Sequence, residues 1–250
     1  MNRKPDPPAL TVRAIRCVGV EVPMSYALGT SRGTITKAPL LLINLDTEEG
    51  ITGHSYLWCY FPAAIPAIAS ILEEVERVVK GERVAPADLG SKLTERFALI
   101  GVQGIVRMAM SGFDVAAWDA LAVAADLPLA TLIGSAPKRI PAYNSCGLGL
   151  MTPDKVADEA EKLLAGGFRA LKLRLGYPTL RDDLAALRAV KKRVGSEVAD
   201  LLKCLVCVCG ISAIVHDDVR PTGGISQSDC LADPTRRTGD HRDLAVQICH

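Results

Sequence analysis

The sequence predicts an α+β domain followed by the start of an α/β fold, either a parallel barrel of the TIM type or a doubly wound sheet. Three observations support this prediction. Strand-like segments come first and amphipathic helices follow them, strand and helix alternate from about residue 138, and the composition changes abruptly near residue 200. The predicted boundaries are 1–137 for the first domain, 138–199 for two β/α units, and 200–250 for an atypical tail.

The first domain begins with a small antiparallel sheet. Residues 10–22 and 39–46 have the apolar and β-branched pattern of strands, and residues 50–56 are typical of a third strand that completes a meander. The segment 24–37 between the first two strands is rich in Gly, Ser and Thr. Its length and polarity predict a mobile flap rather than part of the core.

Three helices are predicted after this sheet. Residues 62–80 place apolar side chains at helical spacing on one face, with the acidic side chains largely away from it. Residues 87–99 and 104–125 are typical of two more helices. The Gly134-Ser135-Ala136-Pro137 stretch then predicts a linker, which ends the first domain.

Strand and helix then alternate. The predicted order is a strand at 140–145, a helix that Thr152 can cap and Pro153 begins, a strand at 170–176, and a helix that ends at Val194-Gly195. A complete barrel has eight strands and typically about 250 residues of its own. Because 113 residues follow residue 137, these residues cannot close a barrel by themselves, and the barrel is predicted to be incomplete.

The strand at 170–176 carries two cations among leucines. Lys172 and Arg174 are two residues apart, so their side chains are predicted to point to the same side of the strand. Inside a parallel barrel, near the C-terminal strand ends, such a pair favours an anionic substrate. The alternative is a basic pair at a strand end whose charged groups reach into water.

The charge pattern excludes several classes of partner. The net charge of +1 comes from interspersed acidic and basic residues, which argues against binding to nucleic acid or to an anionic membrane. Residues 1–8 contain no apolar run for a signal peptide, and no later segment has about 18 uninterrupted apolar residues. We therefore expect a cytoplasmic protein.

Several motifs, taken in order, resemble the mandelate racemase / muconate lactonizing enzyme group of the enolase superfamily, and mandelate racemase most closely. The resemblance covers about residues 10–199. The segments that carry it are Val22-Pro23, Ala38-Pro39-Leu40, Gly53-His54-Ser55-Tyr56-Leu57, 109–120, 128–134, Ala142-Tyr143-Asn144-Ser145, 167–172 and Gly176-Tyr177-Pro178. It implies a capping domain over a modified TIM barrel, one Mg²⁺ ion, a small carboxylate substrate and a homo-oligomer.

The resemblance also implies site residues. Lys172 matches the first lysine of a Lys-x-Lys motif, which lies near the substrate carboxylate, and Arg174 replaces the second, which acts as base. A guanidinium stays protonated at physiological pH, which argues against racemisation by two bases. Relatives with Lys-x-Arg resemble sugar-acid dehydratases, so the resemblance ranks an acid-sugar dehydratase level with, or slightly above, a racemase. Tyr56 and Ser145 match substrate contacts, although Tyr56 could instead fill the sheet and Ser145 could instead form a turn.

The tail departs from the family pattern. Aligned without gaps, the first metal-binding aspartate falls on Lys203, and no Glu follows residue 200, so we expect no metal ligands in this chain. We interpret 200–250 as out of frame or disordered, and the chain as truncated and inactive. Two alternatives are a non-catalytic binding fragment and a zinc-binding tail. The spacing of the tail residues argues against zinc, because Cys230 has no close cysteine partner.

Overall fold

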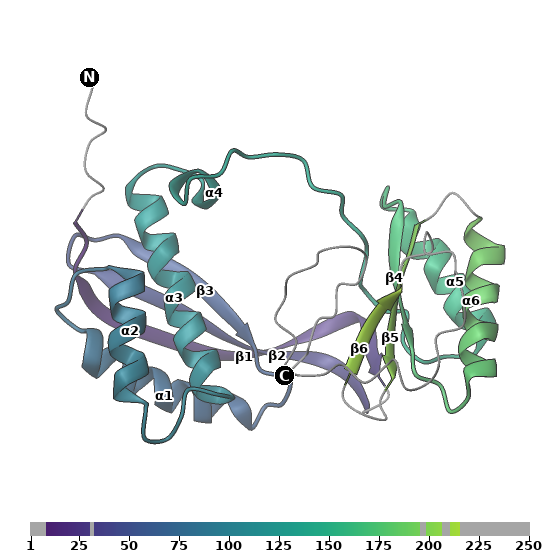
Figure 1. Ribbon diagram of the computed structural model, residues 1–250, viewed down its shortest axis with the longest axis horizontal. Helices are drawn as coiled ribbons and strands as arrows, with labels where there is room; N and C mark the ends of the chain where they lie inside the picture. Colours follow the sequence, from purple (N-terminus) through teal and green to yellow (C-terminus); the bar gives the residue numbers. More distant parts are fainter. Residues whose placement is uncertain (1–8, 31–32, 196–198, 207–210, 216–250) are drawn as a thin grey trace, which may run out of the picture. The chain divides into compact units, whose positions relative to one another are not determined.

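The computed structural model describes residues 9–30, 33–195, 199–206 and 211–215. The chain forms two compact units, which are shown with their helices and strands labelled in Figure 1. The first unit contains Lys37–Arg139 together with the residues up to Met24. The second contains Ser25–Thr36 together with the residues from Ile140 onward. The end of the first hairpin therefore belongs to the second unit, which a single boundary near residue 137 did not anticipate.

The first unit is an α+β domain, as the sequence predicts. Its sheet has the strand order β1-β2-β3, and β2 and β3 pair in antiparallel register with Leu42 opposite Tyr56. The strands are β1 (Val12–Thr30), β2 (Gly33–Thr47) and β3 (Thr52–Trp58), and the helices are α1 (Ala64–Val79), α2 (Pro86–Arg96), α3 (Ile105–Ala124) and the short α4 (Leu129–Leu132). No helix in the described part of the chain is both long and apolar enough to cross a membrane.

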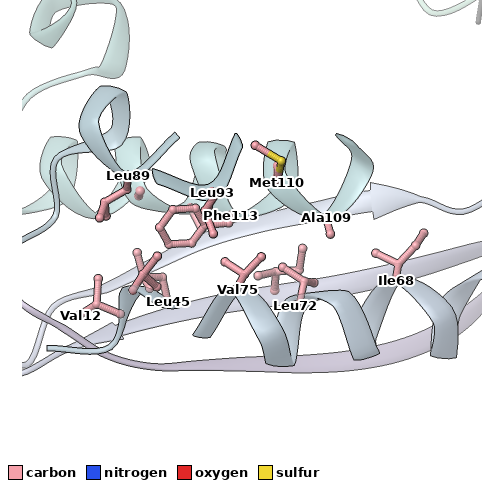
Figure 2. Packing of buried hydrophobic residues seen from close by; sticks show 14 of the residues in the cluster. Val12, Leu45, Ile68, Leu72, Val75, Leu89, Leu93, Ala109, Met110 and Phe113 are labelled. Carbon is pink, nitrogen blue, oxygen red and sulfur yellow. The ribbon is translucent and has the colours of Figure 1, made fainter. Parts of the chain in front are cut away.

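The core of this unit lies between the sheet and the helices. Alternate residues of β2, namely Leu41, Ile43 and Leu45, are almost completely buried, as the period of two in a strand requires. They belong to one cluster with apolar side chains of α1, α2 and α3. Figure 2 shows part of this cluster, including Ile68, Leu72 and Val75 of α1 and Phe113 of α3.

Two glycines allow close packing in this core. A Cβ atom on Gly53 of β3 would lie 2.0 Å from the carbonyl oxygen of Ala116 in α3, and a Cβ atom on Gly112 of α3 would lie 2.5 Å from Cδ1 of Ile43. The Ser55 hydroxyl donates to the Gly112 carbonyl at 2.6 Å, and Asp119 accepts from the His54 N–H at 2.8 Å. Two motifs that are far apart in sequence are therefore joined along a single interface between β3 and α3.

The other face of the sheet carries a charged network. The Arg16 guanidinium donates to both carboxylate oxygens of Asp46, at 2.5 and 2.8 Å, and the Thr52 hydroxyl donates to Asp46 at 3.0 Å. Asp46 is a buried carboxylate. The hydrogen bonds from Arg16 hold the pKa of Asp46 below its ordinary value.

The described residues of the segment 24–37, which the sequence predicts as a mobile flap, extend the two strands on either side of it. The strand β1 runs through it to Thr30, and β2 begins at Gly33. The physical reason lies in β-branched residues such as Thr34, Ile35 and Thr36, which favour extended backbone even where the chain is polar. We call residues 25–30 and 33–36 the arm.

The second unit contains a sheet of order β4-β5-β6. The strands β4 (Ala170–Leu175) and β5 (Ala199–Val206) are parallel, and β5 and β6 (Ile211–Val215) are antiparallel; the helices are α5 (Pro153–Leu164) and α6 (Leu180–Val194). The strand predicted at 140–145 is reduced to a single parallel bridge between Asn144 and Leu171. Pro141, which has no N–H donor, limits the pairing of this segment.

The tail also differs from its prediction. Residues 200–250 were expected to hold little regular structure, yet β5 and β6 lie largely within this range. Both segments are mostly apolar, with the pairs Leu201-Leu202 and Leu205-Val206 in β5, and short apolar runs are compatible with strands. Residues 207–210 and 216–250 lie outside the described residues, and with them most of the cysteines and all the histidines of the proposed zinc-binding tail.

Substitution of Gly53 tests the interface between β3 and α3. We expect Gly53→Ala to lower the free energy of unfolding of the first unit by about 3 kcal/mol, because backbone atoms of α3 leave no room for a methyl group. Gly90→Ala in α2, where a Cβ atom meets nothing within 4 Å, should instead be neutral or gain about 0.5–1 kcal/mol. Denaturation followed by tryptophan fluorescence measures this unit alone, because both tryptophans, Trp58 and Trp118, lie in it. Equal stability of the two variants would contradict the interpretation.

The Asp46 network predicts a pH dependence. Because the folded-state pKa of Asp46 lies below its ordinary value of 3.8, its stabilising effect is complete above that value and is lost as the pH falls through the lower, folded-state pKa. Asp46→Asn should therefore be less stable than the parent at pH 7, and the difference should shrink below about pH 4. Urea denaturation over pH 3–7 measures it. A difference that stays constant across this range would exclude the ionised carboxylate as the cause.

Candidate active site

The alternation of side chains along β4 divides the strand into an apolar face and a cationic face. Leu171 and Leu173 are buried and belong to a cluster with Val156 of α5 and Val190 of α6. Lys172 and Arg174 are half-buried and lie on the opposite face of the strand. The two cations therefore share the side that α5 and α6 do not cover, as their spacing predicts.

Arg174 is held by backbone carbonyls. Its guanidinium donates to the carbonyl oxygen of Gly147, and also to that of Ser145 at 3.2 Å. Burial lowers the pKa of Arg174, while the nearby Cys146, Glu159 and Tyr143 act in the opposite direction. A guanidinium remains a cation under these conditions, so Arg174 can attract or orient an anion but cannot accept a proton.

The chain segment before α5 runs alongside β4 and positions this site. The Asn144 N–H donates to the Ala170 carbonyl at 2.9 Å, and the Lys172 N–H donates to the Asn144 carbonyl at 3.0 Å. Further along, the Arg174 N–H donates to the Leu148 carbonyl at 3.2 Å. The structure therefore brings Ser145 next to Arg174, with the Ser145 side chain exposed and its carbonyl engaged.

Tyr56 belongs to the first unit. Its side chain is 66% exposed on the sheet face that carries Leu42, away from the helices. The Tyr56 side chain therefore does not fill the core of that unit, which the sequence left open as the alternative to a substrate contact. An exposed tyrosine presents both a ring and a hydroxyl to a ligand.

Several residues that sequence reasoning missed hold the loop after β4. The buried carboxylate of Asp183 accepts from the N–H groups of Gly176 and Tyr177, at 2.8 and 3.0 Å. The Tyr177 hydroxyl donates to the Met151 carbonyl at 2.5 Å and accepts from the Met151 N–H at 2.9 Å. The acidic pair in the first turn of α6 was a signal for Asp183, because carboxylates there accept from nearby N–H groups.

The described residues do not fit a magnesium site. No group of three His, Cys, Asp or Glu side chains in the described part of the chain could hold a metal ion. In the parallel register of β4 and β5, Arg174 is paired with Lys203. Lys203 is the position that the family resemblance gives to a metal-binding aspartate, and an ammonium group cannot ligate Mg²⁺.

Comparisons with known proteins agree with this architecture. Residues 12–134 match the family model of the mandelate racemase / muconate lactonizing enzyme N-terminal domain. An enolase from alpha proteobacterium bal199, solved with bound Mg, is 37% identical with a TM-score of 0.74, over 77% of this chain and 54% of that one. The chain belongs to the mandelate racemase / muconate lactonizing enzyme group of the enolase superfamily.

Two further relatives of this group indicate its chemistry. An enolase from Bradyrhizobium, solved with magnesium and mandelic acid, is 33% identical with a TM-score of 0.71, over 78% of this chain and 54% of that one. The L-talarate/galactarate dehydratase of Salmonella typhimurium is 28% identical over 65% of this chain and 41% of that protein. Other homologues are sugar-acid dehydratases and epimerases. The chain spans about half the length of the relatives that it matches.

Substitution of Asp183 tests how the loop after β4 is held. Asp183→Ala leaves the N–H groups of Gly176 and Tyr177 without their acceptor, which should cost the second unit about 2 kcal/mol. Hydrogen exchange at these two amides should rise strongly. Asp154→Ala, an exposed acidic residue in the first turn of α5, is the control and should leave them unchanged. Unchanged exchange in Asp183→Ala would show that the carboxylate does not hold the loop.

Proposed function

We propose that this chain carries the carboxylate-recognising part of an enzyme that acts on a small hydroxy acid or sugar acid. The observation that supports the proposal most strongly is the cationic face of β4, where Lys172 and Arg174 lie opposite the leucines that pack against α5 and α6. Two cations on one half-buried face attract a small anion such as a carboxylate. The acids in the names of the relatives, mandelic acid and galactarate among them, are such anions.

The roles of the two cations differ. Lys172 has an ammonium group on a flexible stem, and such a group can contact a carboxylate or, when deprotonated, accept a proton. Arg174 donates to the carbonyls of Ser145 and Gly147, which fixes its positive charge beside the segment that precedes α5. We assign the carboxylate contact to Lys172, and to Arg174 the fixed charge that holds the substrate and the segment together.

Ser145 is the proposed polar contact of the substrate in the second unit, and Tyr56 stays a prediction from the family resemblance on the first unit. Ser145 has an exposed side chain next to Arg174. Tyr56 has an exposed ring on the first unit. Both residue types offer a hydroxyl that can donate to, or accept from, the hydroxyl groups of a sugar acid.

For the longer enzyme that this chain resembles, we favour dehydration over racemisation as the reaction. Inversion at a carbon needs a proton acceptor on one face of the substrate and a donor on the other. On β4, Lys172 is the one residue of the pair that can exchange a proton, because the guanidinium of Arg174 stays charged. A racemase remains the second candidate, because both dehydratases and epimerases occur among the homologues.

We propose that the 250 residues bind the acid but do not transform it. Abstraction of an α-proton beside a carboxylate needs strong stabilisation of the developing negative charge. The relatives solved with magnesium contain an ion of the required charge. The described residues of this chain do not fit that ion, and Lys203 stands where a ligand is expected. We therefore infer that this chain recognises the acid without completing the reaction of the enzymes that it resembles, and a non-catalytic binding fragment is the alternative.

Deuterium incorporation tests whether the chain is catalytic. We expect no exchange of the α-proton of mandelate or galactarate in D₂O, with or without added Mg²⁺, over hours at micromolar protein, as measured by ¹H NMR. The loss of metal stabilisation removes several kcal/mol from the transition state, which corresponds to several powers of ten in rate. Mg²⁺-dependent exchange that Lys172→Met abolishes would contradict the proposal.

Equilibrium binding tests the carboxylate contact. Lys172→Met keeps the apolar stem and removes the charge, so it should weaken the binding of galactarate about tenfold, which is about 1.4 kcal/mol. Lys192→Met is the matched control, because Lys192 is an exposed residue of α6, and it should bind like the parent. Isothermal titration calorimetry at low salt measures both. Equal affinities of the two variants would remove Lys172 from the site.

A further inference from the structure

The arm meets the rest of the second unit through two glycines. A Cβ atom on Gly149 would lie 2.8 Å from the Cα atom of Gly29 and 2.9 Å from its nitrogen. A Cβ atom on Gly29 would lie 3.3 Å from the Cα atom of Gly149. The two backbones are therefore in direct contact, and any side chain on Gly149 would push against backbone atoms that cannot rotate away.

A tyrosine anchors the arm at the same place. Tyr26, three residues before Gly29, packs against the core cluster of the second unit, which includes the fully buried Leu148. Met151 and Tyr177, joined to each other by two hydrogen bonds, pack against the same cluster. The arm is therefore attached by one backbone contact and one partly buried ring.

The segment under this contact is the one that holds Arg174. The carbonyls of Ser145 and Gly147 accept from the Arg174 guanidinium, and the Leu148 carbonyl accepts from the Arg174 N–H. On the other side, Glu159 of α5 accepts from the Leu148 N–H at 3.1 Å. The segment 145–149 is thus held from three directions, by β4, by α5 and by the arm.

The backbone of this segment is strained. Leu148 has φ of +49° and follows Gly147 at +54°. A leucine rarely adopts a left-handed conformation, and it does so only where the surroundings enforce it. If one of the three restraints is removed, Leu148 can return to a negative φ, which would reorient the carbonyl groups on which Arg174 depends.

We propose that the arm is a latch that positions Arg174. Gly29, Gly149 and Tyr26 pack the arm against the segment 145–149. These contacts keep Leu148 in the left-handed conformation and direct its carbonyl toward the Arg174 N–H. Gly149 and Tyr26 are positioning residues, since they act on Arg174 through the segment. The functional meaning of the latch rests on the proposed role of Arg174, whereas the physical coupling does not.

Single-residue hydrogen exchange in the full chain tests the coupling without any assay of activity. The Arg174 amide donates to Leu148, inside the latched segment, while the Lys172 amide donates to Asn144, outside it. Gly149→Ala and Tyr26→Ala should each raise the exchange rate of the Arg174 amide at least fivefold relative to that of the Lys172 amide. A general loss of stability would raise both rates together.

Matched variants complete the test. Gly166→Ala lies in the same unit, where a Cβ atom meets the Phe168 ring at an ordinary 3.6 Å, and it should leave the ratio of the two rates unchanged. Tyr26→Phe keeps the ring and should restore the parent ratio. If Gly149→Ala does not fold, the ratio of the two exchange rates in Tyr26→Ala tests the latch by itself. An unchanged ratio in Tyr26→Ala would overturn the latch, and so would equal effects of Tyr26→Phe and Tyr26→Ala. Neither outcome depends on whether the chain binds an acid.

Discussion

The structure of the second unit depends on the alternation of side chains along one short strand. In β4, leucines point toward α5 and α6 while Lys172 and Arg174 point to the other side. A shift of one residue in register would bury both charges among aliphatic side chains, at a cost far above the stability of a small unit. The burial of Leu171 and Leu173 therefore fixes the face on which the cations lie, and the same packing that stabilises the unit places the candidate site.

In both units, a glycine lets two segments of the chain approach each other closely. Gly53 lets β3 approach α3, and Gly149 lets the segment before α5 approach the arm. In each case the missing side chain lets two backbones come into direct contact. Glycines that look like turn residues in the sequence are here the points at which separate segments meet.

The sequence predicts the elements better than it predicts the contacts between them. Periods of two and 3.6 residues are local, so the strands and helices of the first unit and the shared face of Lys172 and Arg174 follow from the sequence. The hydrogen-bond partners of Arg174 do not follow from the sequence, because its acceptors lie 27 and 29 residues away along the chain. The extended backbone of the arm was not predicted, because its polarity masked its β-branched residues. The strand β5 was not predicted, because the tail as a whole has an unusual composition.

The central claim is that the cationic face of β4 receives a carboxylate. Acetylation of individual lysines, followed by mass spectrometry of the digested protein, measures the accessibility of Lys172 directly. Saturating galactarate should slow the acetylation of Lys172 several-fold and leave that of the exposed Lys192 unchanged. If galactarate changed the two rates equally, or did not change the rate at Lys172, the assignment of this face as the binding site would be contradicted.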